Sequence, residues 1–160
     1  MVSYTWFNEE LPSDLKYTQV YGITFSDDKR ILLRIEDGKY RLTGGKPEKG
    51  ETYEETVIRE NIEEINVEVE DLHYLGYLLV KEDNLEPYAQ VRMITRIKKI
   101  NPNRPDIDNG KLYDRQLVSL VNVKDYLKYE EAGNAMIDAA IKLATEKYNF
   151  KEQNNNEELV

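Results

Sequence analysis

Residues 44–67 join a glycine turn to a helix with a signal at each end, and this segment constrains the fold more than any other. Thr52 and Glu55 have the spacing of a capping box, which predicts the start of a helix. Asn66 tolerates the left-handed conformation that often ends a helix, so we expect the helix to stop near Ile65 or Asn66. The segment therefore predicts one short helix that is tightly bounded in sequence.

Alternating apolar residues predict strands on both sides of this helix. The expected strands are 21–25, 31–35, 40–43, 67–69, 72–80 and 91–97, and residues 117–123 form a further apolar, partly β-branched run. The pairs Asp27-Asp28 and Asp37-Gly38 predict turns between the first strands, and the second pair is a strong hairpin signal. A last helix is expected from Gly133 or Asn134 to about Tyr148. Several strands with two separate helices favour an α/β (α+β) fold.

The chain has 160 residues, the length of one ordinary domain. No repeat and no Gly/Ser/Pro-rich linker divides it, so we expect a single domain over residues 1–150. Residues 151–160 include three consecutive Asn residues and are predicted to be a disordered tail.

Composition excludes several classes of protein. The net charge of −9 makes passive binding to a nucleic-acid backbone or an anionic membrane unfavourable. Cys is absent and His73 is the only His, which excludes disulfides, thiolate sites and sites with two imidazoles. No apolar run reaches the roughly 20 residues of a membrane span, and the first ten residues do not resemble a signal peptide. We therefore expect a cytoplasmic protein.

Three carboxylates share one face of the expected helix. Glu60, Glu63 and Glu64 are spaced i, i+3, i+4, while Ile58, Ile62 and Ile65 fall on the opposite side and are expected to face the core. Acids this close repel one another unless a cation sits among them, and hard oxygen ligands suit Mg²⁺ or Mn²⁺. A charge run on a helix more often simply faces water, so the cluster alone does not establish a metal site.

The wider segment resembles the Nudix box, the signature of the Nudix hydrolase family. The matching positions are Gly45, Glu51, Arg59, Glu60, Glu63, Glu64 and Val67. Three positions depart from the family pattern: Thr43 replaces a frequent Pro, Asn61 an apolar residue, and Asn66 a Gly. Asn61 is the least favourable of the three, because burying its polar side chain costs about 1–3 kcal/mol unless that side chain finds a hydrogen-bond partner.

The resemblance implies a Nudix-like mixed β-sheet sandwiched between helices. It also implies metal-dependent hydrolysis of a phosphoanhydride bond in a nucleoside diphosphate linked to another group. Mg²⁺, with Mn²⁺ as a substitute, is expected on Glu60, Glu63, Glu64 and the Gly44 carbonyl. Arg59 and Glu51 are expected to pair and fix the loop against the helix, and Glu60 is expected to act on the attacking water. The substrate phosphates are expected near Lys46, Arg34 and Arg41.

The general base stays open. A second acid from a later loop often serves in this family, and two loops carry candidates: Glu82, Asp83 and Glu86 in one, and Asp106, Asp108 and Asp114 in the other. Tyr21, Tyr88 and Tyr113 are candidates for stacking on a base. The loop 101–114 is long enough to act as a lid, and His73 is expected to be structural.

Two other functions stay open beside the hydrolase. The chain is alternatively a catalytically weak or inactive Nudix-like module that binds a nucleotide without cutting it. A small-molecule isomerase or an interaction domain on the same fold is the third hypothesis, since fold alone does not fix function. The expected partner is a nucleotide-type small molecule, with no membrane partner and no nucleic acid except an RNA end that enters a pocket. The particular substrate and the oligomeric state do not follow from the sequence.

Overall fold

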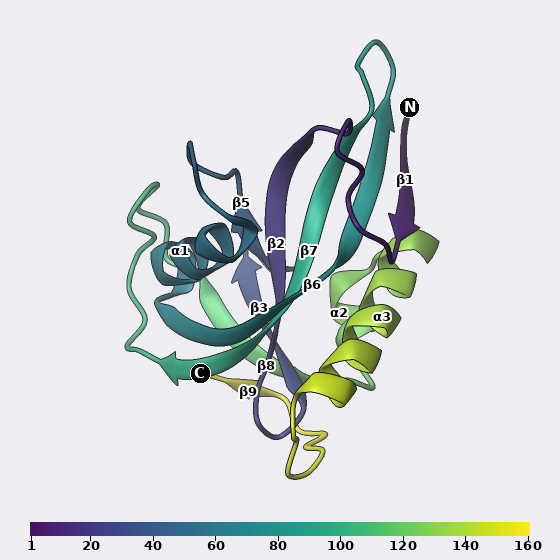
Figure 1. Cartoon of the computed structure of the whole chain (residues 1–160). Helices are drawn as coiled ribbons and strands as arrows, with labels where there is room; N and C mark the ends of the chain where they lie inside the picture. The colour runs from purple at the N-terminus through teal and green to yellow at the C-terminus, as the bar shows by residue number, and fades with distance from the viewer.

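Nine strands form one mixed sheet between helices in the computed structural model, which describes residues 1–160. The strands are β1 Val2–Phe7, β2 Tyr17–Phe25, β3 Arg30–Glu36, β4 Lys39–Arg41, β5 Thr43–Gly45, β6 Val67–Glu82, β7 Tyr88–Ile100, β8 Asp114–Ser119 and β9 Glu158–Leu159. The helices are α1 Tyr53–Ile65, α2 Val123–Leu127 and α3 Glu131–Lys147. Helix α1 lies on one side of the sheet, and α2 and α3 lie on the other (Figure 1). This confirms the predicted α+β fold with a sheet between helices.

The order of the main strands is β1-β6-β7-β2-β3-β8-β9, and β4 and β5 add to β3 and β2. Only β2 and β7 run parallel; the other pairs are antiparallel. Strand β2 pairs with both β5 and β7, so Tyr21 lies opposite Gly44 on one side and Arg92 on the other. This register brings the glycine turn and the middle of β7 to the same part of the sheet.

Helix α1 has the caps that the sequence predicts. The Thr52 side chain accepts from the Glu55 amide at 3.1 Å, and the Glu55 carboxylate accepts from the Thr52 amide at 3.1 Å. Asn66 ends the helix in the left-handed conformation, with a φ of 54°. The expected hairpin is also present, because Asp37 and Gly38 both have positive φ between β3 and β4.

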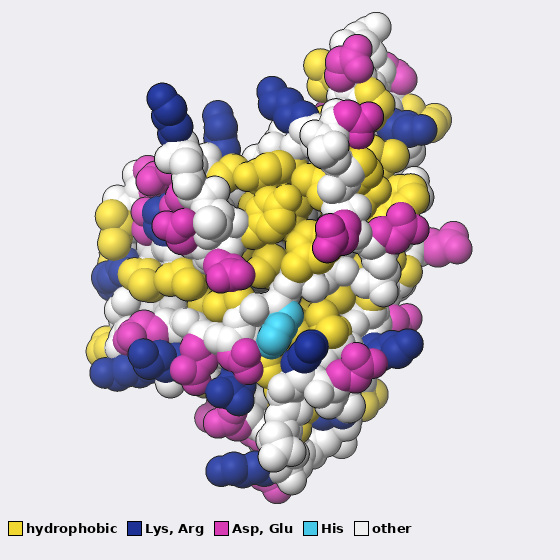
Figure 2. Space-filling view, in the orientation of Figure 1, with side chains coloured by type: hydrophobic (Ala, Val, Ile, Leu, Met, Phe, Trp, Pro, Cys, Tyr) yellow, Lys and Arg dark blue, Asp and Glu magenta, His cyan; other side chains and the backbone are white.

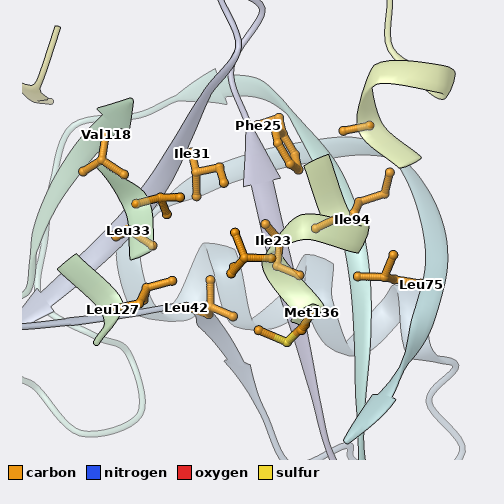
Figure 3. Close-up of a cluster of buried hydrophobic side chains, with 14 of the residues drawn as sticks. Ile23, Phe25, Ile31, Leu33, Leu42, Leu75, Ile94, Val118, Leu127 and Met136 are labelled. Atoms are coloured by element: carbon orange, nitrogen blue, oxygen red, sulfur yellow. The ribbon is translucent and has the colours of Figure 1, made fainter. Parts of the chain in front are cut away.

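The main hydrophobic core lies between the sheet and helices α2 and α3. Figure 3 shows Ile23, Phe25 and Ile94 from the central strands meeting Leu127 and Met136 from the helices. Two smaller clusters lie on the α1 side: Val57 packs with residues of β2 and β7, and Ile65 packs with residues of β3, β6 and β8. The central strands are therefore covered on both faces.

The structure differs from the prediction of a disordered tail at residues 151–160. Strand β9 pairs with β8, and the Asn154 side chain donates to Asp28 at 3.0 Å. Arg30 donates to the Glu158 carboxylate, and Glu157 accepts from Ser119. These contacts span more than thirty residues of sequence, so local composition gave no sign of them.

The prediction of which α1 residues face the core is partly wrong. Ile58 is 37% exposed and Ile62 is half-buried, whereas Thr56, Val57, Asn61, Glu64 and Ile65 form the buried side of the helix. The helix is thus rotated about its axis from the orientation that maximises buried isoleucine. This rotation turns a carboxylate toward the sheet, where it costs stability unless function or a partner compensates.

Three element bounds also differ from expectation. Helix α3 begins at Glu131, before the expected Gly133 or Asn134. The two strands expected after α1 are one strand, β6, in which Asp71 takes a positive φ of 52° at a register shift. The apolar run 117–123 is divided between β8 and α2. None of the helices is long and apolar enough to cross a membrane.

Candidate active site

Two adjacent glycines at β5 make room for the acidic residues of α1. Gly44 has a φ of 149°, and a Cβ there would collide with the Val20 carbonyl and with Tyr21. A Cβ on Gly45 would lie 2.8 Å from a carboxylate oxygen of Glu60. Gly44 requires glycine because of its backbone conformation and the backbone atoms around it, whereas a side chain at Gly45 would displace the Glu60 carboxylate.

Glu60 and Glu64 form the acidic pair of the site; Glu64 is buried and Glu60 is half-buried. The Gly44 amide donates to Glu64 Oε1 at 2.9 Å, and Glu60 lies one turn earlier on the same face of α1. Burial raises the pKa of Glu64; Arg34 and the Gly44 amide lower it in part, and the charges of Glu60 and Asp106 raise it further. Burial likewise raises the pKa of Glu60, against the lowering effect of Arg59. Two carboxylates in this setting hold excess negative charge that an added cation would stabilise.

Arg59 ties the loop before α1 to the helix, as expected. Its guanidinium donates to both carboxylate oxygens of Glu51, at 2.6 and 3.0 Å, and to the Lys46 carbonyl at 3.1 Å. It also donates to Glu60 at 3.0 Å and to Glu63 at 3.1 Å. The hydrogen bond from Arg59 lowers the pKa of Glu51 to about 2, so this carboxylate stays charged at neutral pH.

The three acids of the predicted metal set are not equivalent in the structure. Glu63 faces Arg59, while Glu64 is directed to the Gly44 amide and to Arg34. No group of three or more Asp, Glu or His side chains lies in an arrangement that holds a metal ion. The donor set of Glu60 and Glu64 still fits a divalent cation, because it provides adjacent carboxylate oxygens in a cluster where two arginines face four carboxylates.

The predicted phosphate-binding cations lie at different distances from these acids. Arg34 Nε is 2.9 Å from Glu64 Oε2, though it is not oriented to donate a hydrogen bond, and the guanidinium lies over the Tyr113 ring. Arg41 is half exposed, with Nε 3.9 Å from Glu36. The side chain of Lys46 is exposed in the loop after β5. Arg34 is therefore the cation most closely tied to the acidic pair.

A cleft of about 1160 Å³ is lined by Arg34 and by residues of the α2–α3 segment. Tyr21, Arg34, Arg41 and Arg92 contribute to its wall, together with residues of β1 and of the α2–α3 segment. Figure 2, which views the molecule as in Figure 1, shows acidic and basic side chains mixed over α1. The cleft adjoins the acidic pair through Arg34 and is large enough for a nucleotide-sized ligand.

The first loop of candidate bases lies away from the site. Glu82 accepts from Tyr88, and Asp83 contacts the N-terminal ammonium group at the β6–β7 hairpin. Figure 1 shows this hairpin at the opposite end of the sheet from α1. Glu82, Asp83 and Glu86 are therefore not brought to the acidic pair, and Tyr88 is likewise held at this hairpin.

The second loop packs on the end of α1. Asp106 is buried, accepts from the amides of Asp108 and Asn109, and contributes to the raised pKa of Glu64. Asp108 and Asp114 are exposed. Of these three candidate bases, Asp106 is the one that acts electrostatically on Glu64. The hydrogen bonds that Asp106 accepts within its own loop are a structural role that also accounts for its burial.

Sequence analysis missed two arginines. Arg104 donates to the Ile62 and Glu63 carbonyls and so caps the end of α1 from the 101–114 loop. Arg92 is 5% exposed at the base of the cleft, on the strand face that it shares with buried Ile94. The presence of Ile94 two residues away was the signal that this face of β7 is covered.

The departures from the family pattern have structural explanations. Asn61 is fully buried, but its amide donates to the Val57 carbonyl and its oxygen accepts from Thr43 Oγ1, both at 2.9 Å. Thr43 and Asn61, which both depart from the pattern, therefore satisfy each other. Asn66 supplies the left-handed helix end that Gly would otherwise supply.

Residues 16–140 match the family model described as the NUDIX domain. The chain belongs to the Nudix hydrolase family. A pyrophosphohydrolase from Bacillus subtilis, BsRppH, is similar in structure, with a TM-score of 0.68 and 19% identity over 88% of this chain and 90% of that one. A MutT structure from a study of Aliivibrio salmonicida and Vibrio cholerae has a TM-score of 0.56 and 21% identity over 78% of this chain and 94% of that one. No curated protein matches the sequence.

Identities this low show a shared Nudix fold and leave the substrate of this chain open. The family assignment explains why a helix with an acidic face follows a glycine pair.

Proposed function

We propose that this Nudix protein is a Mg²⁺-dependent pyrophosphohydrolase that cuts a phosphoanhydride bond in a nucleoside diphosphate linked to another group. Mn²⁺ is the expected substitute metal. The observation that carries the proposal is the acidic pair of buried Glu64 and half-buried Glu60 against the Gly44–Gly45 turn. Carboxylates of this kind are costly in the folded protein and become useful when they hold cations beside an anionic substrate.

In the proposed reaction, water attacks one phosphorus atom of the anhydride, and the bridging P–O bond breaks. The bridging oxygen leaves with the electron pair on the departing phosphate, and the water gives up its protons. Glu60 is proposed to orient this water or to accept its proton. Glu60, Glu63, Glu64 and the Gly44 carbonyl are the proposed ligands of the divalent ion. When bound, that ion neutralises phosphate charge and lowers the pKa of water.

The remaining residues position the reactants. Arg59 holds Glu51, Glu60 and Glu63 in place through the hydrogen bonds described above, and is proposed to keep the loop and helix in register. Arg34, Arg41 and Lys46 are proposed to meet the substrate phosphates. Hydrolysis leaves a phosphate on each of two products. Cations outside the acidic cluster are therefore needed to bind these phosphates as well.

The alternative of a nucleotide-binding module without hydrolysis loses its sequence support. It rested on Asn61 and Asn66, and both have a satisfied structural role. The full set of acids, the arginine that positions them and the adjacent cleft favour an enzyme.

The test is a hydrolysis screen over a broad panel of nucleotide derivatives, with Mg²⁺ or Mn²⁺, read as phosphate released after added phosphatase. We expect at least one substrate to be cut, and we expect EDTA to abolish the reaction. The Glu64→Gln variant should lose about a hundredfold or more in turnover, whereas Glu54→Gln, an exposed position of the same helix, should keep wild-type turnover. Circular dichroism checks that both variants fold.

Full turnover in the Glu64→Gln variant would remove the proposal. Tight binding of a nucleotide with no product across the panel and both metals would replace it with the binding module.

A further inference from the structure

Arg92 is a buried cation that lacks a partner of opposite charge. It has 5% of its surface exposed, and no carboxylate forms a salt bridge with it. Its hydrogen bonds are two long contacts of 3.3 Å, to the carbonyl of Val91 and to the side chain of Gln90. Its Nε has no hydrogen-bond partner at all. Burying a guanidinium in this state costs stability, so another role is expected to offset the cost.

The surroundings of Arg92 are those of a ligand cleft. Arg92 belongs to the wall of the cleft of about 1160 Å³, and its guanidinium stacks 4.7 Å from the ring centre of Tyr21. Five Lys or Arg side chains and three Asp or Glu side chains line this cleft: Arg34, Lys39, Arg41, Arg92 and Lys128 against Asp125, Glu130 and Glu131. A cationic cleft on a chain of net charge −9 is a local reversal that suits an anion.

The register of the strands sets the spacing between Arg92 and the acidic pair. Tyr21 pairs with Gly44 on one side and with Arg92 on the other, so the backbones at Gly44 and Arg92 are two strand spacings apart, about 10 Å. Arg34 lines the cleft and its Nε lies 2.9 Å from Glu64, so this arginine links the cleft to the acidic pair. An anion at Arg92 is thus separated from the proposed scissile bond by Tyr21.

We propose that Arg92 binds a second phosphate group of the substrate, one that is carried by the ribose and is not part of the scissile anhydride. The strand of Tyr21 lies between the acidic pair and Arg92, which favours a phosphate that is set apart from the scissile bond. A phosphate on the ribose is held away from the anhydride by the sugar. The planar guanidinium suits phosphate because it donates two parallel hydrogen bonds, and the free Nε of Arg92 is available for one of them.

The inference rests on the proposed function for the position of the anhydride, but its test needs no hydrolysis. Calorimetry in EDTA would compare nucleoside 3′,5′-bisphosphates with the matching 5′-monophosphates, for adenosine, guanosine, cytidine and uridine. The wild-type protein should bind the bisphosphate about tenfold or more tightly for at least one base. In the Arg92→Met variant the two ligands of that base should bind equally, to within about twofold.

Arg96→Met is the matched control. Arg96 lies on the same strand and is a partly exposed arginine paired with Glu70, so its variant should keep the wild-type preference for the bisphosphate. Circular dichroism and the melting temperature confirm that both variants are folded. The same phosphate chemistry occurs on a free nucleotide and at the first linkage of an RNA end. A 5′-phosphorylated dinucleotide, which carries a diester in place of the monoester, distinguishes these two sources.

Three results would overturn the proposal. They are equal binding of both ligands by the wild-type protein for all four bases, no binding of any bisphosphate up to about 5 mM, and an unchanged preference in Arg92→Met. Failure of hydrolysis with an intact preference for the bisphosphate would count against the proposed function alone.

Discussion

The candidate active site and the C-terminal edge of the sheet both bury charged side chains, and they stabilise them in opposite ways. At the edge formed by β3, β8 and β9, Arg30 pairs with Asp28 and Glu158, and Arg115 donates to three backbone carbonyls. In the site, two arginines face four carboxylates, because Arg59 contacts Glu51, Glu60 and Glu63 and Arg34 contacts Glu64. Arg92 has no anionic partner at all. The edge therefore balances its charges within the chain, whereas the site keeps excess charge that a ligand can neutralise.

The difference teaches that burial of a charge does not by itself indicate function. Arg115 and Arg92 are almost equally buried, at 4% and 5% exposure, and only their partners distinguish them. A group that the fold has satisfied is expected to contribute stability. A group that the fold has left unsatisfied is expected to reduce stability and to contribute binding or catalysis.

The largest expected effect is the difference in stability between the Arg115→Met and Arg92→Met variants. Arg115→Met leaves the carbonyls of Ile65, Asn101 and Val160 without their donor and should lower the free energy of unfolding by about 3 kcal/mol. Arg92→Met removes an unsatisfied charge and keeps an apolar side chain, so it should leave the free energy of unfolding unchanged or raise it. Urea denaturation measures both values. A larger loss in Arg92→Met than in Arg115→Met would break the comparison.

A smaller effect is expected at Asn61, a satisfied polar group inside the site helix. Asn61→Leu removes the acceptor of Thr43 Oγ1 and should cost about 1–2 kcal/mol of unfolding free energy. The double variant with Thr43→Val replaces both partners by apolar groups and should recover part of that loss. Strictly additive losses in the denaturation cycle would show that the two residues do not support each other.

Helix α1 could be predicted from sequence because its signals are local. Thr52, Glu55 and Asn66 lie at its own ends, and the pairing of Arg59 with Glu51 lies within one loop and helix. The hairpin at Asp37-Gly38 is local in the same sense. These features depend on residues a few positions apart, where residue type and spacing carry the information.

Other features depend on contacts between distant segments. Strand β9 is held by Arg30 and Arg115, and the end of α1 is capped by Arg104 from a later loop. Whether Arg92 faces water or a cleft depends on how the α2–α3 segment covers the sheet. The rotation of α1 that exposes Ile58 and buries Glu64 reflects contacts with β5, which no helical periodicity contains.

The smallest expected effect is the change with pH of the stability that the Glu51 carboxylate contributes. The pKa of Glu51 is lowered to about 2 by Arg59, so its stabilisation is present above its ordinary value of 4.5 and is lost as the pH falls towards 2. Glu51→Gln should cost about 1 kcal/mol or less of unfolding free energy at pH 7, and the difference from wild type should shrink below pH 4. Denaturation curves across that range measure it. A difference independent of pH would show that the carboxylate charge does not contribute.

Manganese uptake tests the central claim most directly, because the account requires that the acidic pair holds a divalent cation. Titration of Mn²⁺ into the protein, with free Mn²⁺ followed by electron paramagnetic resonance, should show uptake that Mg²⁺ displaces. Glu64→Gln should weaken this uptake by about tenfold or more, while Glu54→Gln should bind as wild type does. The absence of any uptake by the wild-type protein, or equal uptake by Glu64→Gln, would contradict the account.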